Sequence, residues 1–176
     1  MTKTARVKSI AVGGVIAGVL LLAPGLAFAQ QVSTDWDKTA TFTGFKTYTL
    51  TKGQVPAGAN PLMVQRVETA IGSELAALGL LRAEKGGDVT VVYHASTKED
   101  VSLQSMGYGP RWGGGTVNVN RILNAMLIVD VSDSQAKNLL WRATATDTVS
   151  DNPQKNEKKI QKAVEKMFEK YPTAPQ

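Results

Sequence analysis

His94 is the only histidine in this chain of 176 residues, so it is the first candidate for acid–base chemistry near neutral pH. Strand alternation places it on the polar side of a strand, near Arg142 and Thr144. A catalytic triad could be drawn with Ser96 or Ser102 and an aspartate, but the sequence has no G-x-S-x-G elbow or comparable frame. We therefore favour a partly exposed sheet histidine that hydrogen-bonds locally, and keep a hydrolase that uses His94 as the alternative.

Two carboxylates, Asp35 and Asp37, are separated by one residue and point to the same side of an expected strand. Such a pair could bind Ca²⁺, but an oxygen cage needs six or more ligands and the chain has no EF-type loop. We favour solubility of an edge strand, or local turn hydrogen bonds, as their role. The sequence predicts no metal site and no cofactor.

A glycine-rich connector, GYGPRWGGG, occupies residues 107–115. It lacks the glycine spacings of phosphate-binding loops, and no helix follows it to receive an anion. Tyr108 and Trp112, with Arg111 beside them, could offer exposed aromatic surface to a sugar, a peptide or a lipid headgroup. A flexible hairpin loop without a ligand is the reading we favour.

A hairpin over residues 121–148 is expected to organise the fold. Its odd positions from Leu123 to Val131 are all apolar, the turn falls at residues 132–135, and alternation resumes around Trp141, which we assign to the core. The opposite face carries Met126, Ile128 and Arg142, with Asn124 and His94 nearby. No helix remains to cover that face, so we predict that it binds a partner.

The remaining elements follow from periodicity and capping signals. Strands are expected at residues 32–36, within 41–50 after Gly44, at 80–84, at 88–95, and at 97–106 pairing with a strand after residue 116. One helix is predicted from the Asn60-Pro61 cap to Gly79, and a lysine-rich one ends at Pro172. This order predicts an α+β fold: a mostly antiparallel sheet with two helices packed on one face, a two-layer sandwich.

The first 29 residues have the three parts of a secretory signal peptide. Basic residues precede an apolar run over 10–23, and Ala27-Phe28-Ala29 gives an A-x-A cleavage site between Ala29 and Gln30. The run is too short to span a membrane before Pro24. We therefore expect one domain over residues 30–176, which leaves 176 less 29, or 147 residues, after cleavage.

Composition narrows the classes of function. The leader holds three of the 20 basic residues and no acidic one, so the remaining 17 basic and 15 acidic residues give a net charge of +2, and no nucleic-acid partner is predicted. With no cysteine, disulfides, zinc–thiolate sites and thiol nucleophiles are excluded. A lipid-bearing cysteine at the first mature position is excluded too, because Gln30 stands there; no stable membrane anchor is expected after cleavage. We read the lysines of the last helix as a solvated face.

The order and spacing of several motifs from Val32 to Pro172 resemble the DUF4136 family of bacterial envelope proteins, many of them lipoproteins. The motifs are Asp35-Trp36-Asp37 with Phe42, Phe45 and Tyr48; Asn60-Pro61-Leu62; Ala76-Ala77-Leu78-Gly79-Leu80; Val91-Val92-Tyr93-His94; the 107–115 connector; Leu127-Ile128-Val129-Asp130; Leu140-Trp141-Arg142; and Tyr171-Pro172 after the last helix. The resemblance implies an exported α+β protein and no particular activity. The absent lipid-attachment cysteine departs from the common pattern.

These inferences converge on an exported, periplasmic or secreted protein that acts as a non-enzymatic binding or structural module. Its expected ligand is an envelope protein, a peptide or a glycan. The candidate binding residues are Tyr108, Trp112, Met126, Ile128, Arg142 and His94. The sequence predicts neither an oligomeric state nor a catalytic residue.

Overall fold

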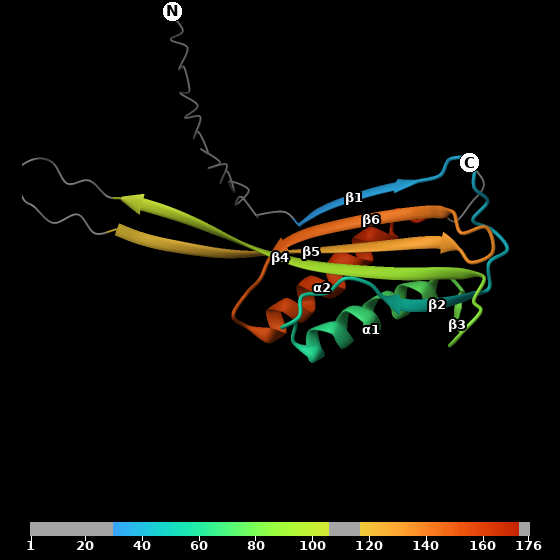
Figure 1. The fold of residues 1–176 in the computed structure, drawn as a ribbon, viewed down its shortest axis with the longest axis horizontal. Helices are drawn as coiled ribbons and strands as arrows, with labels where there is room; N and C mark the ends of the chain where they lie inside the picture. The colour runs from blue at the N-terminus through green and yellow to red at the C-terminus, as the bar shows by residue number, and fades with distance from the viewer. Residues whose placement is uncertain (1–29, 106–116, 173–176) are drawn as a thin grey trace, which may run out of the picture.

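The computed structural model describes residues 30–105 and 117–172. The expected signal peptide and the 107–115 connector, with Tyr108 and Trp112, lie outside the described residues. Six strands form a single sheet in the order β1-β6-β5-β4-β2-β3 (Figure 1). They are β1 (Gln31–Trp36), β2 (Thr47–Lys52), β3 (Leu81–Arg82), β4 (Val89–Ser105), β5 (Val117–Asp133) and β6 (Leu139–Thr148).

The sheet is mixed, so the expectation of a mostly antiparallel sheet is wrong. β1 pairs antiparallel with β6, β6 with β5, and β5 with β4, whereas β2 runs parallel to both β3 and β4. The reason is that a helix connects β2 to β3, and a strand–helix–strand crossover brings its two strands back in the same direction. Gly87, just before β4, lies so close to the backbone of β2 that an added Cβ would be 2.6 Å from the Tyr48 carbonyl carbon.

The segments expected at 88–95 and 97–106 form one continuous strand, β4. It pairs with β5 from Val89–Asp133 to Ser105–Val117, which includes the predicted pairing with the strand after residue 116. Pairing of β5 with β6 ends at Asn124–Thr148, and pairing of β4 with β2 ends at Tyr93. Beyond these points β4 and β5 pair only with each other and project from the body as a two-stranded arm (Figure 1).

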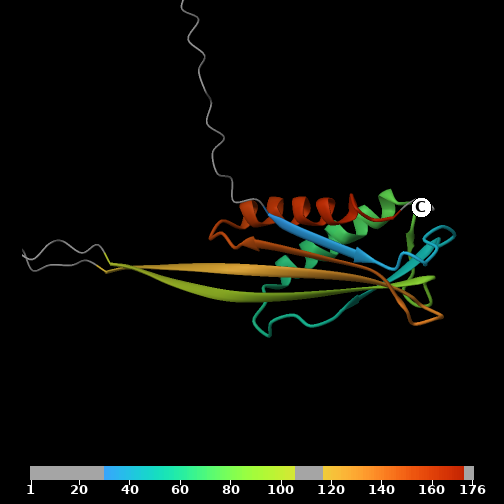
Figure 2. The same ribbon diagram turned by 90° about the horizontal axis from the view of Figure 1, so that it is seen from above.

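Two helices lie on the same side of the sheet (Figure 2). α1 (Pro61–Ala77) follows the predicted cap, in which the Asn60 side chain accepts a hydrogen bond from the Leu62 N–H, and Gly79 ends it with a φ of 84°. α2 (Pro153–Phe168) is capped by Asn152. No helix among the described residues is long and apolar enough to cross a membrane.

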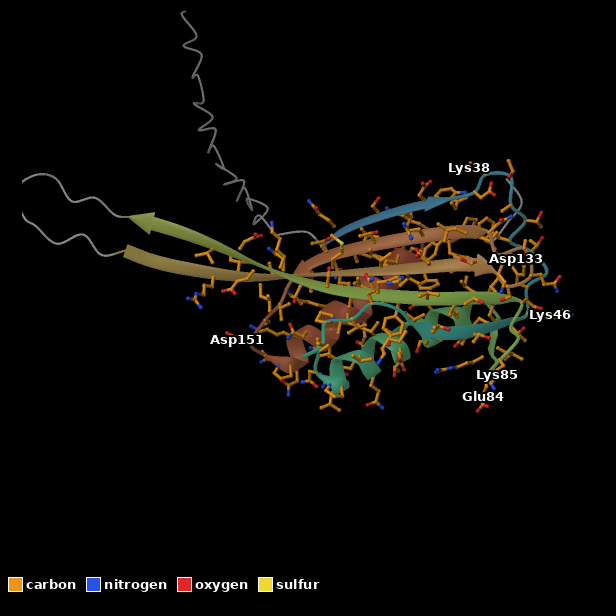
Figure 3. The ribbon with its side chains drawn as sticks, viewed as in Figure 1. Lys38, Lys46, Glu84, Lys85, Asp133 and Asp151 are labelled. Carbon is orange, nitrogen blue, oxygen red and sulfur yellow. The ribbon has the colours of Figure 1, made fainter. Side chains whose placement is uncertain are left out.

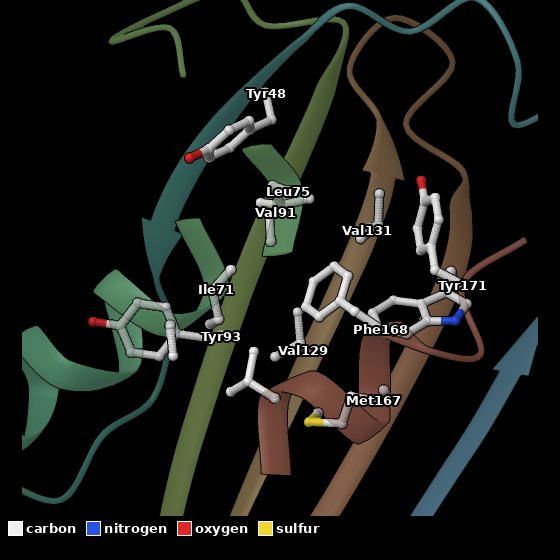
Figure 4. Packing of buried hydrophobic residues seen from close by; sticks show 14 of the residues in the cluster. Tyr48, Ile71, Leu75, Val91, Tyr93, Val129, Val131, Met167, Phe168 and Tyr171 are labelled. Carbon is white, nitrogen blue, oxygen red and sulfur yellow. The ribbon is translucent and has the colours of Figure 1, made fainter. Parts of the chain in front are cut away.

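The core lies between the helices and the predicted odd-residue face of the central hairpin (Figure 4). Val129, Val131 and Trp141 are fully buried there, so the predicted face and the core position of Trp141 are confirmed. Trp141 packs against Phe168 and Tyr171, with ring centroids 5.1 and 5.3 Å away. These large side chains fill the half of the domain that lies away from the arm.

Candidate functional site

The open sheet face brings four of the predicted binding residues together. His94, Met126, Ile128 and Arg142 line one shallow hollow of about 260 Å³, the open-face hollow, together with Gln54, Ala95 and Ser96. The register explains the grouping, because His94 pairs with Ile128, Ile128 pairs with Thr144, and Arg142 lies one row along. The position of the Arg142 side chain is fixed by an ion pair with a buried carboxylate.

That carboxylate belongs to Asp130, which is 8% exposed and lies opposite Arg142 on β5. The Arg142 Nε and Nη2 atoms donate to the two Asp130 oxygens, each at 2.6 Å. These hydrogen bonds, with the carboxylate charge, raise the pKa of Arg142. The Nε and Nη2 atoms are therefore committed to Asp130, which fixes the guanidinium as a wall of the hollow, while Nη1 has no hydrogen-bond partner among the described residues and half of the side chain stays exposed.

His94 is also held by a local contact. Its Nδ1 accepts the backbone N–H of Gln54 at 3.0 Å, and a Cβ added to Gly53 would lie 2.5 Å from the ring. Among the described side chains, no hydrogen bond joins His94 to Ser96 or to a carboxylate. The ring thus has the local bonding that we favoured from sequence. A catalytic triad also needs a carboxylate hydrogen-bonded to the histidine, and no such contact is present among the described side chains.

The other polar candidates also bond locally. Asp37 accepts hydrogen bonds from the Thr39 hydroxyl and N–H, and these bonds lower the pKa of Asp37. Asp35 accepts from the Trp36 N–H. Within the described ranges, no group of three or more acidic, histidine or cysteine side chains could hold a metal ion. The charged side chains labelled in Figure 3, such as Lys46, lie at the termini of elements and in loops.

A second, larger site was not predicted. Between the N-terminal halves of the helices and the sheet lies a cleft of about 570 Å³, the apolar cleft. Its lining divides into three groups: a roof of Val64, Val67, Ile160 and Ala163; a floor of Ala95, Ala125, Leu127 and Ala145; and a mouth that includes Gln30, Asn60, Asp147 and Lys159.

Small residues create this cleft. The floor residues continue the face that carries Tyr93, Val129 and Trp141, but three of the four are alanines. Large side chains fill the space between the sheet and the other half of the helices. Over the alanines, the corresponding space stays open, because a methyl group is too short to fill it. Tyr93 closes the inner end. Its hydroxyl donates a hydrogen bond to Glu68 on α1 at 2.6 Å. Burial is the main cause of the raised pKa of Tyr93, and this hydrogen bond is the second cause.

The mouth is polar and mostly paired internally; the exception is the buried Oε1 atom of Gln30, which has no hydrogen-bond partner among the described residues. Lys159 Nζ donates to Asp147 Oδ1 at 2.9 Å and to the Thr148 carbonyl at 2.7 Å. Gln30 Nε2 donates to the Lys159 carbonyl at 2.9 Å. Lys159 therefore differs from the solvated lysine that we expected on this helix, because it ties α2 to the end of β6.

Periodicity could not reveal the cleft, because alanine counts as apolar whether it packs against a neighbour or leaves a space. The one available signal was the recurrence of alanine at 95, 125, 145 and 163 in patterns that otherwise carry larger side chains. The volume lies within the range typical of small-molecule sites, and the walls are mostly apolar with a few polar groups at the rim.

The family model described as a domain of unknown function, DUF4136, matches residues 32–173, which confirms the resemblance found in the sequence. No curated protein matches the chain significantly. Among solved structures, a PDZ domain protein from Parabacteroides distasonis is similar at 14% identity with a TM-score of 0.53, covering 81% of this chain and 35% of that one. A PelC dodecamer from Paraburkholderia phytofirmans is similar at 13% identity with a TM-score of 0.51, covering 80% and 95%.

At sequence identities this low, the similarity shows only that this chain and the two solved structures share a fold. This chain spans about a third, 35%, of the length of the PDZ domain protein and nearly all, 95%, of the PelC chain.

Proposed function

The chain belongs to the DUF4136 family, and from that premise we propose that it is an exported cell-envelope protein that binds an apolar ligand without catalysing a reaction. The observation that carries this proposal is the apolar cleft. A space of about 570 Å³ with apolar walls that are open to water favours an apolar ligand, since binding removes apolar surface of both partners from water. Export rests on the signal-peptide pattern of residues 1–29.

Binding in the cleft can be tested with an apolar dye such as N-phenylnaphthylamine, whose fluorescence rises in an apolar site. The Ala125→Phe variant should strongly weaken saturable binding, because the ring would project into the cleft from its floor and block it lengthwise. Asn124→Phe is the matched control: it adds the same ring one residue away, on the opposite face of β5, and should bind as the parent does. Equal binding by both variants would place the dye outside the cleft.

Export and cleavage can be tested by the intact mass of the protein recovered from the cell envelope. We expect a chain that begins at Gln30. A chain that still begins at Met1 would contradict cleavage, and protein found only in the cytosol would contradict export.

A second candidate function is the binding of an envelope protein or peptide on the open sheet face. It is favoured by the half-exposed Met126 and Ile128 side chains between the fixed His94 and Arg142. We expect Ile128→Lys to lose partners that the parent captures from envelope extracts. Ile122→Lys, on the same face but out on the arm, should keep them. Changing both Tyr108 and Trp112 to Ala tests the connector in the same assay.

A further inference from the structure

The shape of the apolar cleft follows the strands and helices that bound it. Along the floor its lining runs from Tyr93 to Thr97 on β4, and along the roof it runs from Asn156 to Ala163 on α2. These spans correspond to about 10–13 Å. Exposure increases along this direction, from 1% at Tyr93 to 40% at Leu123. The cleft is thus a channel with a closed inner end and an outer end that opens toward the arm.

The charged side chains of the lining cancel, and cleavage before Gln30 would add one positively charged α-amino group at the mouth. Asp147 and Lys159 are the only charged side chains among the described lining residues, and they form an ion pair at 2.9 Å. An ionised ligand drawn inside would lose its hydration without finding a free partner, which is costly. A neutral hydrocarbon loses nothing of that kind, so the electrostatics of the channel complement an uncharged chain.

Two asparagine side chains at the mouth are also committed, whereas the buried Oε1 atom of Gln30 has no hydrogen-bond partner among the described residues. The Asn60 side chain caps α1, and both ends of the Asn156 amide bond to Ser150. They can border a polar headgroup where it meets water, but they have little remaining capacity to select one. The interior should therefore set the affinity.

From this geometry we infer that the occupant is a membrane lipid whose unbranched acyl chains lie lengthwise over the alanine floor, with its headgroup at the outer end. The inference rests on the proposed function, since it specifies the ligand of the same cleft. A volume of about 570 Å³ over a length of about 10–13 Å has room for more than one chain, and a closed inner end with an open outer end suits linear chains that enter lengthwise. Because hydrocarbon burial supplies the binding energy, each added methylene should strengthen binding until the chain outgrows the channel.

The experiment uses the mature protein and displacement of N-phenylnaphthylamine by straight-chain alcohols from hexanol to hexadecanol, each below its aggregation concentration. Affinity should rise about fourfold per methylene and then level off once the chain exceeds the channel length. The matching fatty acids should follow the same curve within a few-fold. Affinities that do not depend on chain length, or that depend chiefly on the carboxylate, would overturn the acyl assignment.

Two blocking variants, Ala125→Phe on the floor and Val64→Trp on the roof, guard against a substitution that merely unfolds the protein. Each should remove the chain-length dependence while the circular dichroism spectrum stays that of the parent, and Asn124→Phe should retain it. If the dye binds in the cleft but compact ring compounds displace it better than linear chains, the acyl assignment fails and the proposed function survives. If the dye does not bind in the cleft at all, the proposed function itself fails.

Discussion

Asp130 is the one buried charged side chain among the described residues, and only Arg142 neutralises it. Replacing Arg142 with Ala should lower the free energy of unfolding by about 1–2 kcal/mol, because it leaves a buried carboxylate without its partner; the exposure of half the Arg142 side chain keeps the figure below that of a fully buried pair. Urea denaturation at neutral pH measures the change.

The control for this pair is the double variant Asp130→Asn with Arg142→Met. Removing both charges removes the cost of an unpaired one, so the double variant should recover part of the stability that Arg142→Ala loses. If the double variant loses, relative to the parent, the sum of the losses measured for Asp130→Asn and Arg142→Met separately, the two residues do not act as a pair.

Glu74 on α1 lacks, among the described residues, a neutralising partner of the kind that Asp130 has, and lies instead near other carboxylates. Burial, and then the neighbouring charges of Glu165 and Glu169, raise the pKa of Glu74. An acid whose pKa is raised by folding costs stability when ionised, so Glu74→Gln should stabilise the protein at pH 7 by about 0.5 kcal/mol. The gain should disappear as the pH falls below the ordinary glutamate pKa of 4.5, where both states are protonated. A gain that is independent of pH would rule out this electrostatic origin.

At the scale of elements, α1 begins at the apolar cleft and α2 reaches it at Asn156, one turn after its cap, so both caps help to hold the roof. Asn60 accepts the Leu62 N–H, and Asn152 accepts the N–H groups of Gln154 and Lys155. Replacing either asparagine with Ala should cost about 1 kcal/mol of stability. Amide hydrogen exchange should accelerate in the first turn of the affected helix only. Acceleration spread evenly over both helices would indicate global destabilisation instead.

The arm formed by β4 and β5 should be the least protected part of the described sheet. Beyond Asn124, each of its strands has one neighbour, and its described ion pairs, Lys98–Asp100 and Arg121–Glu99, are exposed. Its backbone amides should therefore exchange faster than those of Val129 and Val131 in the sheet centre. Equal protection along the whole of β5 would contradict this and would indicate a further contact along the arm.

At the scale of the whole molecule, most of the fold could be predicted from the sequence because its signals were local. The Asn60-Pro61 cap, the stop at Gly79 and the alternation around Val129 and Trp141 each depend on neighbouring residues, and each is found as expected. The mixed sheet was mispredicted because the direction of β2 depends on the crossover through α1, and not on any pattern within so short a strand.

The candidate sites divide in the same way. Strand parity sufficed to place His94, Met126, Ile128 and Arg142 on one face, and the structure brings them around one hollow. Neither the buried ion pair of Asp130 with Arg142 nor the cleft could be predicted, because both depend on how far apart two elements lie. An alanine on an apolar face carries no sign of whether its neighbour fills the space above it.

The central claim is that the cleft holds an apolar chain, and methyl NMR during titration with dodecanol tests it most directly. The account predicts saturable shifts at Ala125, Leu127, Val64 and Ile160, which line the cleft, with Ile122 and Ile128 on the opposite sheet face unchanged. Shifts centred on Ile128, or shifts that never saturate at any position, would contradict it.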